Sequence, residues 1–145
     1  MKKILLILIS IFMLSFASDI PTRTGTFPDK EMKSQNKKIT NLVAEEISST
    51  LPQIVDKYTT LISVKANNLT LVYTFKIKTG SKSDEVIKKE DHSRMKKAII
   101  LGVCQSSSKF LVVGINTSYI YISAKTSAQL FKFDISQKDC VKSKN

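Results

Sequence analysis

The sequence predicts an α+β domain in which a four-stranded antiparallel sheet carries helices on one face and is closed by one disulfide bond. Apolar residues recur at spacings of three and four in residues 30–55 and 84–105, a pattern typical of amphipathic helices. Residues 59–78 and 115–135 instead alternate apolar and polar side chains, as half-buried strands do. Because a strand pair follows each helix, the expected order is helix, hairpin, helix, hairpin.

The first 17 residues are typical of an export signal. Two lysines precede an apolar run from Ile4 to Phe16 that is too short to span a bilayer, and small residues near Ala17 suit cleavage after it. No cysteine lies near that point to carry a lipoprotein lipid. We therefore expect a periplasmic or secreted protein without a transmembrane anchor after processing. The expected divisions are a signal peptide (1–17), a flexible leader (18–29) and a single α+β domain (30–145).

The first helix of the domain is expected to begin near residue 30 and to be ended or kinked by Pro52, which lacks an amide donor. A tight turn at Asn67 and Asn68 should then join two strands, because asparagine tolerates positive φ. The residues that define these elements are Ile39, Leu42, Val43, Ile47, Leu51, Ile54 and Val55 in the helix, Ile62, Val64 and Ala66 in the first strand, and Leu69, Leu71, Tyr73, Phe75 and Ile77 in the second.

A second helix is expected from about Asp84 to Gln105, capped by Ser81 or Ser83. Residues 109–113 then form a short helix closed by Gly114 or, alternatively, a strand. The last hairpin should pair a central strand at 115–123 with a strand whose apolar face is formed by Phe131, Phe133 and Ile135.

Cys104 and Cys140 are the two cysteines of the chain. In an exported protein, an even number of cysteines favours a disulfide bond. Such a bond would stabilise the fold by roughly 3 to 4 kcal/mol in the chain-entropy model. A catalytic Cys104 paired with His92 is disfavoured, since twelve helical positions would separate the two side chains by about 18 Å.

The chain is basic, with 23 Lys and Arg against 12 Asp and Glu and a net charge of +11, or about +9 once two signal-peptide lysines are removed. This charge favours an anionic partner. Another envelope or secreted protein is the expected partner, an anionic lipid or lipopolysaccharide is possible, and nucleic acid is disfavoured by export. The candidate anion-binding or partner-binding residues are Lys37, Lys38, Lys76, Lys78, Lys96, Lys97 and Lys132.

The sequence gives no specific sign of catalysis. One histidine and scattered carboxylates do not suggest a metal site, and four glycines form no phosphate-binding loop, so we expect no cofactor, no metal and no enzyme activity. Aromatic pairs two residues apart on three strands could stack on nucleic-acid bases. Burial under the helices is the preferred interpretation, because the strand lysines alternate with them.

Distributed positions of residues 50–140 resemble an uncharacterised family of small exported bacterial proteins with two cysteines. They are Leu51-Pro52, Val55-Asp56, Thr60-Leu61, Ser63-Val64, Leu71, Tyr73, Cys104, Gly114, Tyr119-Ile120-Tyr121 and Asp139-Cys140, whereas Phe75 stands where a tyrosine is more usual. The resemblance implies a disulfide-bonded α+β fold outside the cytosol, sometimes encoded near secretion or conjugation genes, with no catalytic residues.

Three functions remain open at this point. The first is a non-catalytic interaction module of the bacterial envelope, such as an accessory, inhibitor or immunity-type protein. The second is a secreted factor that contacts host or competitor cells through a basic surface. The third is a hydrolase with an unrecognised Ser, Asp or Glu site.

Overall fold

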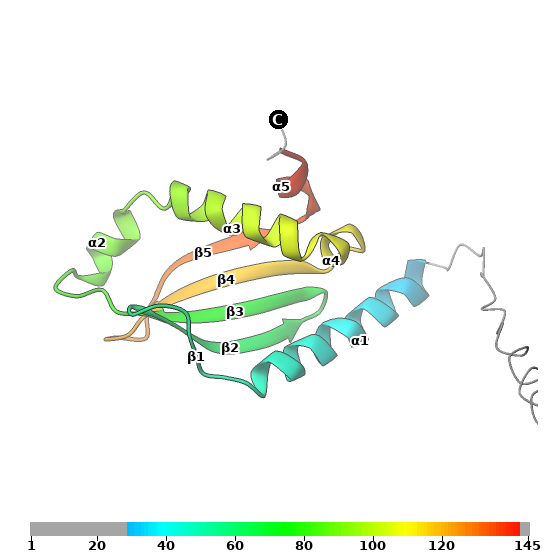
Figure 1. Cartoon of the computed structure of the whole chain (residues 1–145), viewed down its shortest axis with the longest axis horizontal. Helices are drawn as coiled ribbons and strands as arrows, with labels where there is room; N and C mark the ends of the chain where they lie inside the picture. Colours follow the sequence, from blue (N-terminus) through cyan, green and yellow to red (C-terminus); the bar gives the residue numbers. More distant parts are fainter. Residues whose placement is uncertain (1–28, 143–145) are drawn as a thin grey trace, which may run out of the picture.

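The protein contains a five-stranded mixed sheet with helices packed against it (Figure 1). The computed structural model describes residues 29–142, so the predicted signal peptide and nearly all of the predicted leader lie outside the described residues. In sequence order the elements are α1 (Asp29–Ser48), β1 (Gln53–Ile54), β2 (Thr59–Asn67), β3 (Thr70–Ile77), α2 (Asp84–Lys89), α3 (Ser93–Ser106), α4 (Ser108–Val112), β4 (Asn116–Ser123), β5 (Gln129–Ile135) and α5 (Gln137–Lys142).

The prediction of four antiparallel strands was wrong in strand number and in direction. The strands lie in the order β1-β2-β3-β4-β5, and β3 pairs with β4 in parallel, whereas the other neighbours are antiparallel. The reason is the helical connection between β3 and β4. A helix that returns the chain across the sheet lets the next strand run in the same direction as the previous one. The two hairpins are therefore joined by a parallel central pair.

The additional strand comes from residues that the sequence pattern placed in the first helix. α1 ends at Ser48, and Gln53–Ile54 pairs with residues 60 and 61 of β2. Pro52 disfavours helical backbone at the preceding residue, and the Leu51–Pro52 peptide bond is cis. The apolar residues after the proline thus lie in a strand and a turn, outside the helix.

The first hairpin confirms the predicted turn. Asn68 has a φ of 55° and lies between β2 and β3. The inward face of β2 differs from the prediction at one residue, since a bulge between Leu61 and Ser63 places Leu61, instead of Ile62, in the core. The following residues recover the expected alternation, with Val64 buried.

The predicted second helix is divided into α2 and α3. Asp91 accepts hydrogen bonds from the amide and the hydroxyl of Ser93, both at 2.9 Å, and these bonds compete with a continuous helical backbone. Ser83 caps the N-terminus of α2, so of the two predicted caps, Ser81 and Ser83, the second is confirmed. The preferred alternative for the next segment, a short helix, is confirmed by α4, which is followed by Gly114 at a φ of 86°.

The core lies on one face of the sheet. Residues of β2 to β5 on this face pack with Val43, Ala44 and Ile47 of α1, Ile99 of α3 and Phe110 of α4. Burial of Phe75, Tyr121 and Phe133 confirms that most of the aromatic pairs belong to the core. The other face carries Val72, Ile120 and Ile122, none of which belongs to a hydrophobic cluster among residues 29–142.

A second, smaller cluster lies where the chain ends. Val103, Leu111 and Ile135 are buried together, and Cys140 packs against them. The structure contains the predicted disulfide between Cys104 and Cys140, which joins α3 to α5. The C-terminal helices and β5 are therefore connected both by apolar packing and by a covalent bond.

Candidate partner-binding surface

The seven candidate lysines do not form one basic patch. Lys37 and Lys38 are exposed on α1, whereas Lys96 and Lys97 are exposed on α3. Lys76 and Lys132 lie on the sheet face opposite the core, and Lys78 follows the end of β3. Because the seven lysines lie on different elements and on both faces of the sheet, one anion cannot contact all of them.

Two of these lysines, Lys132 and Lys96, act on the same carboxylate, that of Asp134. Lys132 forms an ion pair with Asp134 at 2.9 Å, and Lys96 is near enough to affect the same carboxylate. Partial burial raises the pKa of Asp134, but the hydrogen bond from Lys132 and the positive charges of Lys132 and Lys96 outweigh it, so the pKa is lowered. At neutral pH this group presents an ionised, already paired carboxylate.

A cavity of about 230 Å³ lies at the end of the sheet near this ion pair. Its lining is formed by Thr70, Asn116, Thr117, Asp134, Ile135 and Ser136. The Ser136 hydroxyl donates to Asp139 at 3.0 Å and acts with the Ser136 amide in capping α5. The carboxylate in this lining, Asp134, is paired with Lys132, and the other lining residues are two threonines, an asparagine, an isoleucine and a serine.

Residues 29–142 contain no sign of a metal site or of a membrane-spanning helix. These residues hold no group of three His, Cys, Asp or Glu side chains able to bind a metal ion. Within the same range, every helix is too short or too polar to cross a membrane. The remaining candidate is the partly exposed surface between α1 and α3.

The floor of that surface is a row of stacked aromatic rings across β3, β4 and β5. The Tyr73 and Tyr119 rings are 5.1 Å apart, and the row continues through Phe75 and Tyr121 to Phe131. Phe75 and Tyr121 are buried, but Tyr73, Tyr119 and Phe131 are only half-buried. The helices therefore leave part of this aromatic row uncovered.

Desolvation changes the acidity of the tyrosines in this row. Burial raises the pKa of Tyr119 to about 12, with smaller contributions from Tyr73 and Tyr121. Burial, together with the charge of Asp56, raises the pKa of Tyr121 to about 12 as well. Both rings consequently stay neutral at physiological pH and offer apolar faces with hydroxyl groups.

One wall of the surface is a flank of α1. Ser48 donates its hydroxyl to the Val64 carbonyl of β2 at 2.7 Å, so the Ser48 flank faces that strand. Asn36 donates from Nδ2 to the Val113 carbonyl at 2.8 Å, so its flank faces the end of α4. Ile39 lies on the Asn36 flank by helical spacing, and it is 40% exposed.

The opposite wall is a flank of α3 formed by small residues. Cys104 and Ile100 face α5 and the C-terminal cluster. Ala98, Gly102 and Ser106 follow one another at intervals of four on the other side of the helix, and all three are exposed. A Cβ atom added to Gly102 would meet no atom within 4 Å, so the space beside this flank is open.

These residues define the inter-helix surface. α1 packs mainly on β2, whereas α3 packs on β5, α4 and α5, and the two helices share no extensive contact (Figure 1). The inter-helix surface consists of Ile39, Val43, Tyr73, Met95, Ala98, Gly102, Ser106 and Tyr119. It combines partly exposed aromatic and aliphatic groups with a flank that another backbone can approach closely.

Part of this surface could have been predicted from the sequence. The intervals of four between Ala98, Gly102 and Ser106 could have indicated a flank of small residues. Its position opposite α1 could not have been foreseen, because it depends on the parallel pairing of β3 with β4.

Three solved structures have the same overall fold at low sequence identity. The pilotin EpsS of the Vibrio vulnificus type 2 secretion system is 11% identical, with a TM-score of 0.63 over 77% of this chain and 96% of its own. The Vibrio cholerae type II secretion system pilotin AspS is 12% identical, with a TM-score of 0.60 over 77% and 97%.

The third structure is a Pseudomonas aeruginosa protein that is provisionally described as secreted. It is 14% identical, with a TM-score of 0.66 over 80% of this chain and 99% of its own. No protein-family model and no curated protein sequence match the chain. The chain thus has the α+β fold of two type II secretion pilotins and of this third protein.

Proposed function

We propose that the protein is a non-catalytic interaction module of the bacterial envelope, and that it binds a helical segment of another exported protein at the inter-helix surface. The observation that carries this proposal is the pairing of an uncovered aromatic row with the open, small-residue flank of α3. Helices approach each other most closely where small residues lie at intervals of four.

A helix fits this site better than an extended peptide. Two walls formed by helices, with an apolar floor between them, match the apolar face of an amphipathic helix. The ligand would bury the half-exposed rings of Tyr73 and Tyr119, and aromatic side chains contribute strongly to binding interfaces.

The partner is expected to be acidic outside its apolar face. The chain carries a net charge of +11, and exposed basic residues such as Lys97 and Lys109 lie on α3 and α4. Complementary charge would speed association and select against basic partners.

The fold shared with secretion pilotins supports an envelope accessory role, and the predicted export signal supports a periplasmic or secreted location. A secreted factor acting on other cells is the second candidate, favoured by the fold shared with the Pseudomonas aeruginosa protein. Recovery of the protein only from culture medium, with none in the periplasmic extract, would favour that second function.

The test is affinity capture from an envelope extract with wild-type protein and with Gly102→Leu. The added side chain would enter the open space beside α3, so we expect the specific partner to be lost from the captured proteins. Because leucine has a higher helix propensity than glycine, stability should rise or stay unchanged.

Asn41→Leu is the matched control. It adds a leucine to an exposed position of α1 that lies seven residues before Ser48, on the flank that faces β2 and away from the inter-helix surface. The control should capture the partner as wild type does. Equal capture by wild type and Gly102→Leu would contradict binding at this surface.

A further inference from the structure

The turn between β1 and β2 presents three neighbouring apolar side chains to solvent. Ile54 is 83% exposed, Val55 58% and Tyr58 55%. Ile54 has the highest exposure of the large apolar side chains between residues 29 and 142. We name residues 54–58 the tip.

The tip is held rigidly by its own hydrogen bonds. The Asp56 carboxylate accepts from the amides of Tyr58 at 2.7 Å and Thr59 at 2.9 Å. The amide of Val55 donates to the Thr59 carbonyl at 3.0 Å, and the amide of Lys78 donates to the Tyr58 carbonyl at 2.9 Å. These bonds fix the exposed side chains at a defined position beside the end of β3.

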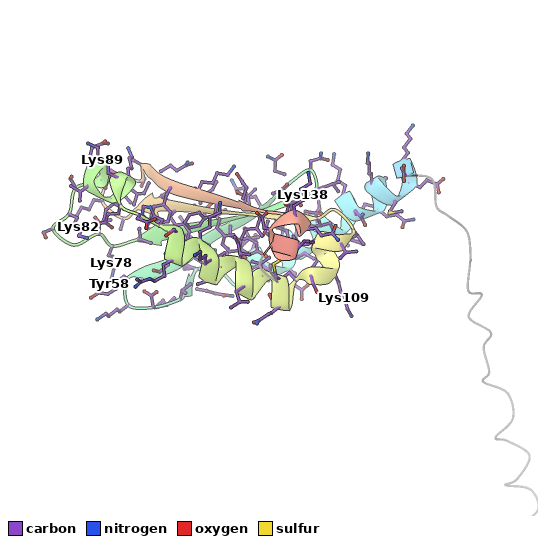
Figure 2. The ribbon with its side chains drawn as sticks, turned by 90° about the horizontal axis from the view of Figure 1, so that it is seen from above. Tyr58, Lys78, Lys82, Lys89, Lys109 and Lys138 are labelled. Carbon is purple, nitrogen blue, oxygen red and sulfur yellow. A yellow bond between two sulfur atoms is a disulfide. The ribbon has the colours of Figure 1, made fainter. Side chains whose placement is uncertain are left out.

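Two lysines lie beside the apolar groups of the tip, which also contains the ionised Asp56 carboxylate. The Lys57 ammonium lies 4.7 Å from the centre of the Tyr58 ring, and Lys78 follows β3 next to the tip. Neither lysine forms an ion pair within residues 29–142. Figure 2 shows Tyr58 and Lys78 at the same end of the molecule as Lys82 and Lys89.

We propose that the tip inserts into the interface of an anionic phospholipid membrane and attaches the protein peripherally. Exposed aliphatic groups would enter the boundary between headgroups and acyl chains, and a tyrosine ring suits headgroup depth. Lysines beside them would remain at the surface and attract anionic headgroups. The exposed side chains of the tip form a convex apolar group on a turn, which suits a membrane interface better than a protein pocket.

This attachment is independent of the inter-helix surface. A tip that binds lipid directly would keep the protein at a membrane while the inter-helix surface remains available to a partner.

Tryptophan fluorescence tests the proposal directly, because the chain contains no tryptophan. The variant Ile54→Trp, purified in the exported form of the protein, carries a single tryptophan, and this fluorophore lies in the tip. With phosphatidylglycerol vesicles its emission should shift to shorter wavelength and become protected from a soluble quencher. Phosphatidylcholine vesicles should produce neither change.

Leu42→Trp is the control, since Leu42 is 64% exposed on α1 outside the tip. Its emission should not change with either vesicle. In a second assay without tryptophan, Ile54→Ser should lower the vesicle partition coefficient of the exported protein about tenfold.

Three results would overturn the proposal. They are an absence of vesicle binding, binding without an emission shift at Ile54→Trp, and equal shifts at the two reporters. Each can occur whether or not the inter-helix surface binds a protein, so failure of one proposal does not decide the other.

Discussion

The two helical groups on the core face are held in different ways. α1 buries Asn36, Thr40 and Ala44, which are polar or small, whereas the C-terminal group buries Val103 and Leu111 with Ile135 of β5. The C-terminal group also contains the disulfide. α1 packs Val43, Ala44 and Ile47 on the main core cluster, and no covalent bond joins it to the sheet within the described residues.

The two walls of the inter-helix surface therefore differ in rigidity, because a disulfide constrains the α3 wall but not the α1 wall. Its α3 wall belongs to the cross-linked C-terminal group, whereas its α1 wall is held by packing on the sheet and by individual hydrogen bonds such as that from Asn36 to Val113. A partner helix would therefore meet one fixed wall and one wall able to adjust. The predictions below test this asymmetry.

Removal of the disulfide should have the largest effect. Replacing Cys104 and Cys140 together by serine should lower the free energy of unfolding by about 4 kcal/mol, since the loop closed by 36 residues of separation restricts the unfolded chain. Urea titration of the variant and of wild type measures the loss. A change below about 1 kcal/mol would show that the bond does not hold the C-terminal group.

A cavity in the C-terminal cluster should cost more than a truncation under α1. Ile135→Ala, at a side chain 1% exposed, should destabilise by about 2 to 5 kcal/mol. Thr40→Ala should cost only about 1 kcal/mol, because its hydroxyl bonds the Asn36 carbonyl within the same helix. Equal losses in urea titrations would contradict the proposed difference between the two groups.

The buried tyrosines predict a loss of stability at alkaline pH. The pKa of Tyr121 is raised to about 12 in the fold and is about 10 in the unfolded chain, so unfolding favours tyrosinate formation. This contribution is complete below pH ~10 and is lost as the pH rises towards 12. Tyr121→Phe should reduce the alkaline slope of stability, and an unchanged slope would contradict the assignment.

Asn36→Ala should loosen α1 selectively. Loss of the hydrogen bond to the Val113 carbonyl should cost about 1 kcal/mol. Amide hydrogen exchange should accelerate in α1 and remain nearly unchanged in α3. Equal acceleration in both helices would mean that they open together.

The smallest expected effect is a gain. Gly102→Ala should stabilise α3 by about 0.5 to 1 kcal/mol, because glycine is a poor helix former and the added Cβ has open space. Thermal unfolding with Gln105→Ala as the same-helix control measures this gain. A destabilised Gly102→Ala protein would show that the space beside α3 is already occupied.

Much of the fold follows from local patterns in the sequence. Asn67 and Asn68 indicated the first turn, and Gly114 indicated the end of a short helix. These features depend on backbone preferences of single residues, which act over a few positions. The predicted end of the first helix near Pro52 is confirmed, but prediction failed just after it, where Ile54 and Val55 continue the helical spacing, and at Asp91, where side-chain hydrogen bonds interrupt the second helix.

The sheet topology and the candidate surfaces depend on contacts between distant residues. Parallel pairing of β3 with β4 decides which flank of α3 faces α1, and helical periodicity alone does not specify it. The tip was missed because Ile54 and Val55 continue the apolar spacing of α1. The seven predicted lysines lie on several elements and on both faces of the sheet, and a binding role for any of them stays a prediction.

Site-specific photo-crosslinking in the producing cells tests the inter-helix surface most directly. A photoreactive residue at Ile39 or at Ala98, one on each wall, should give crosslinks to the same exported protein, whereas one at Asn41, on the flank of α1 that faces β2, should give none. Crosslinks from Asn41 alone, or different partners from the two walls, would contradict a single helix bound between α1 and α3.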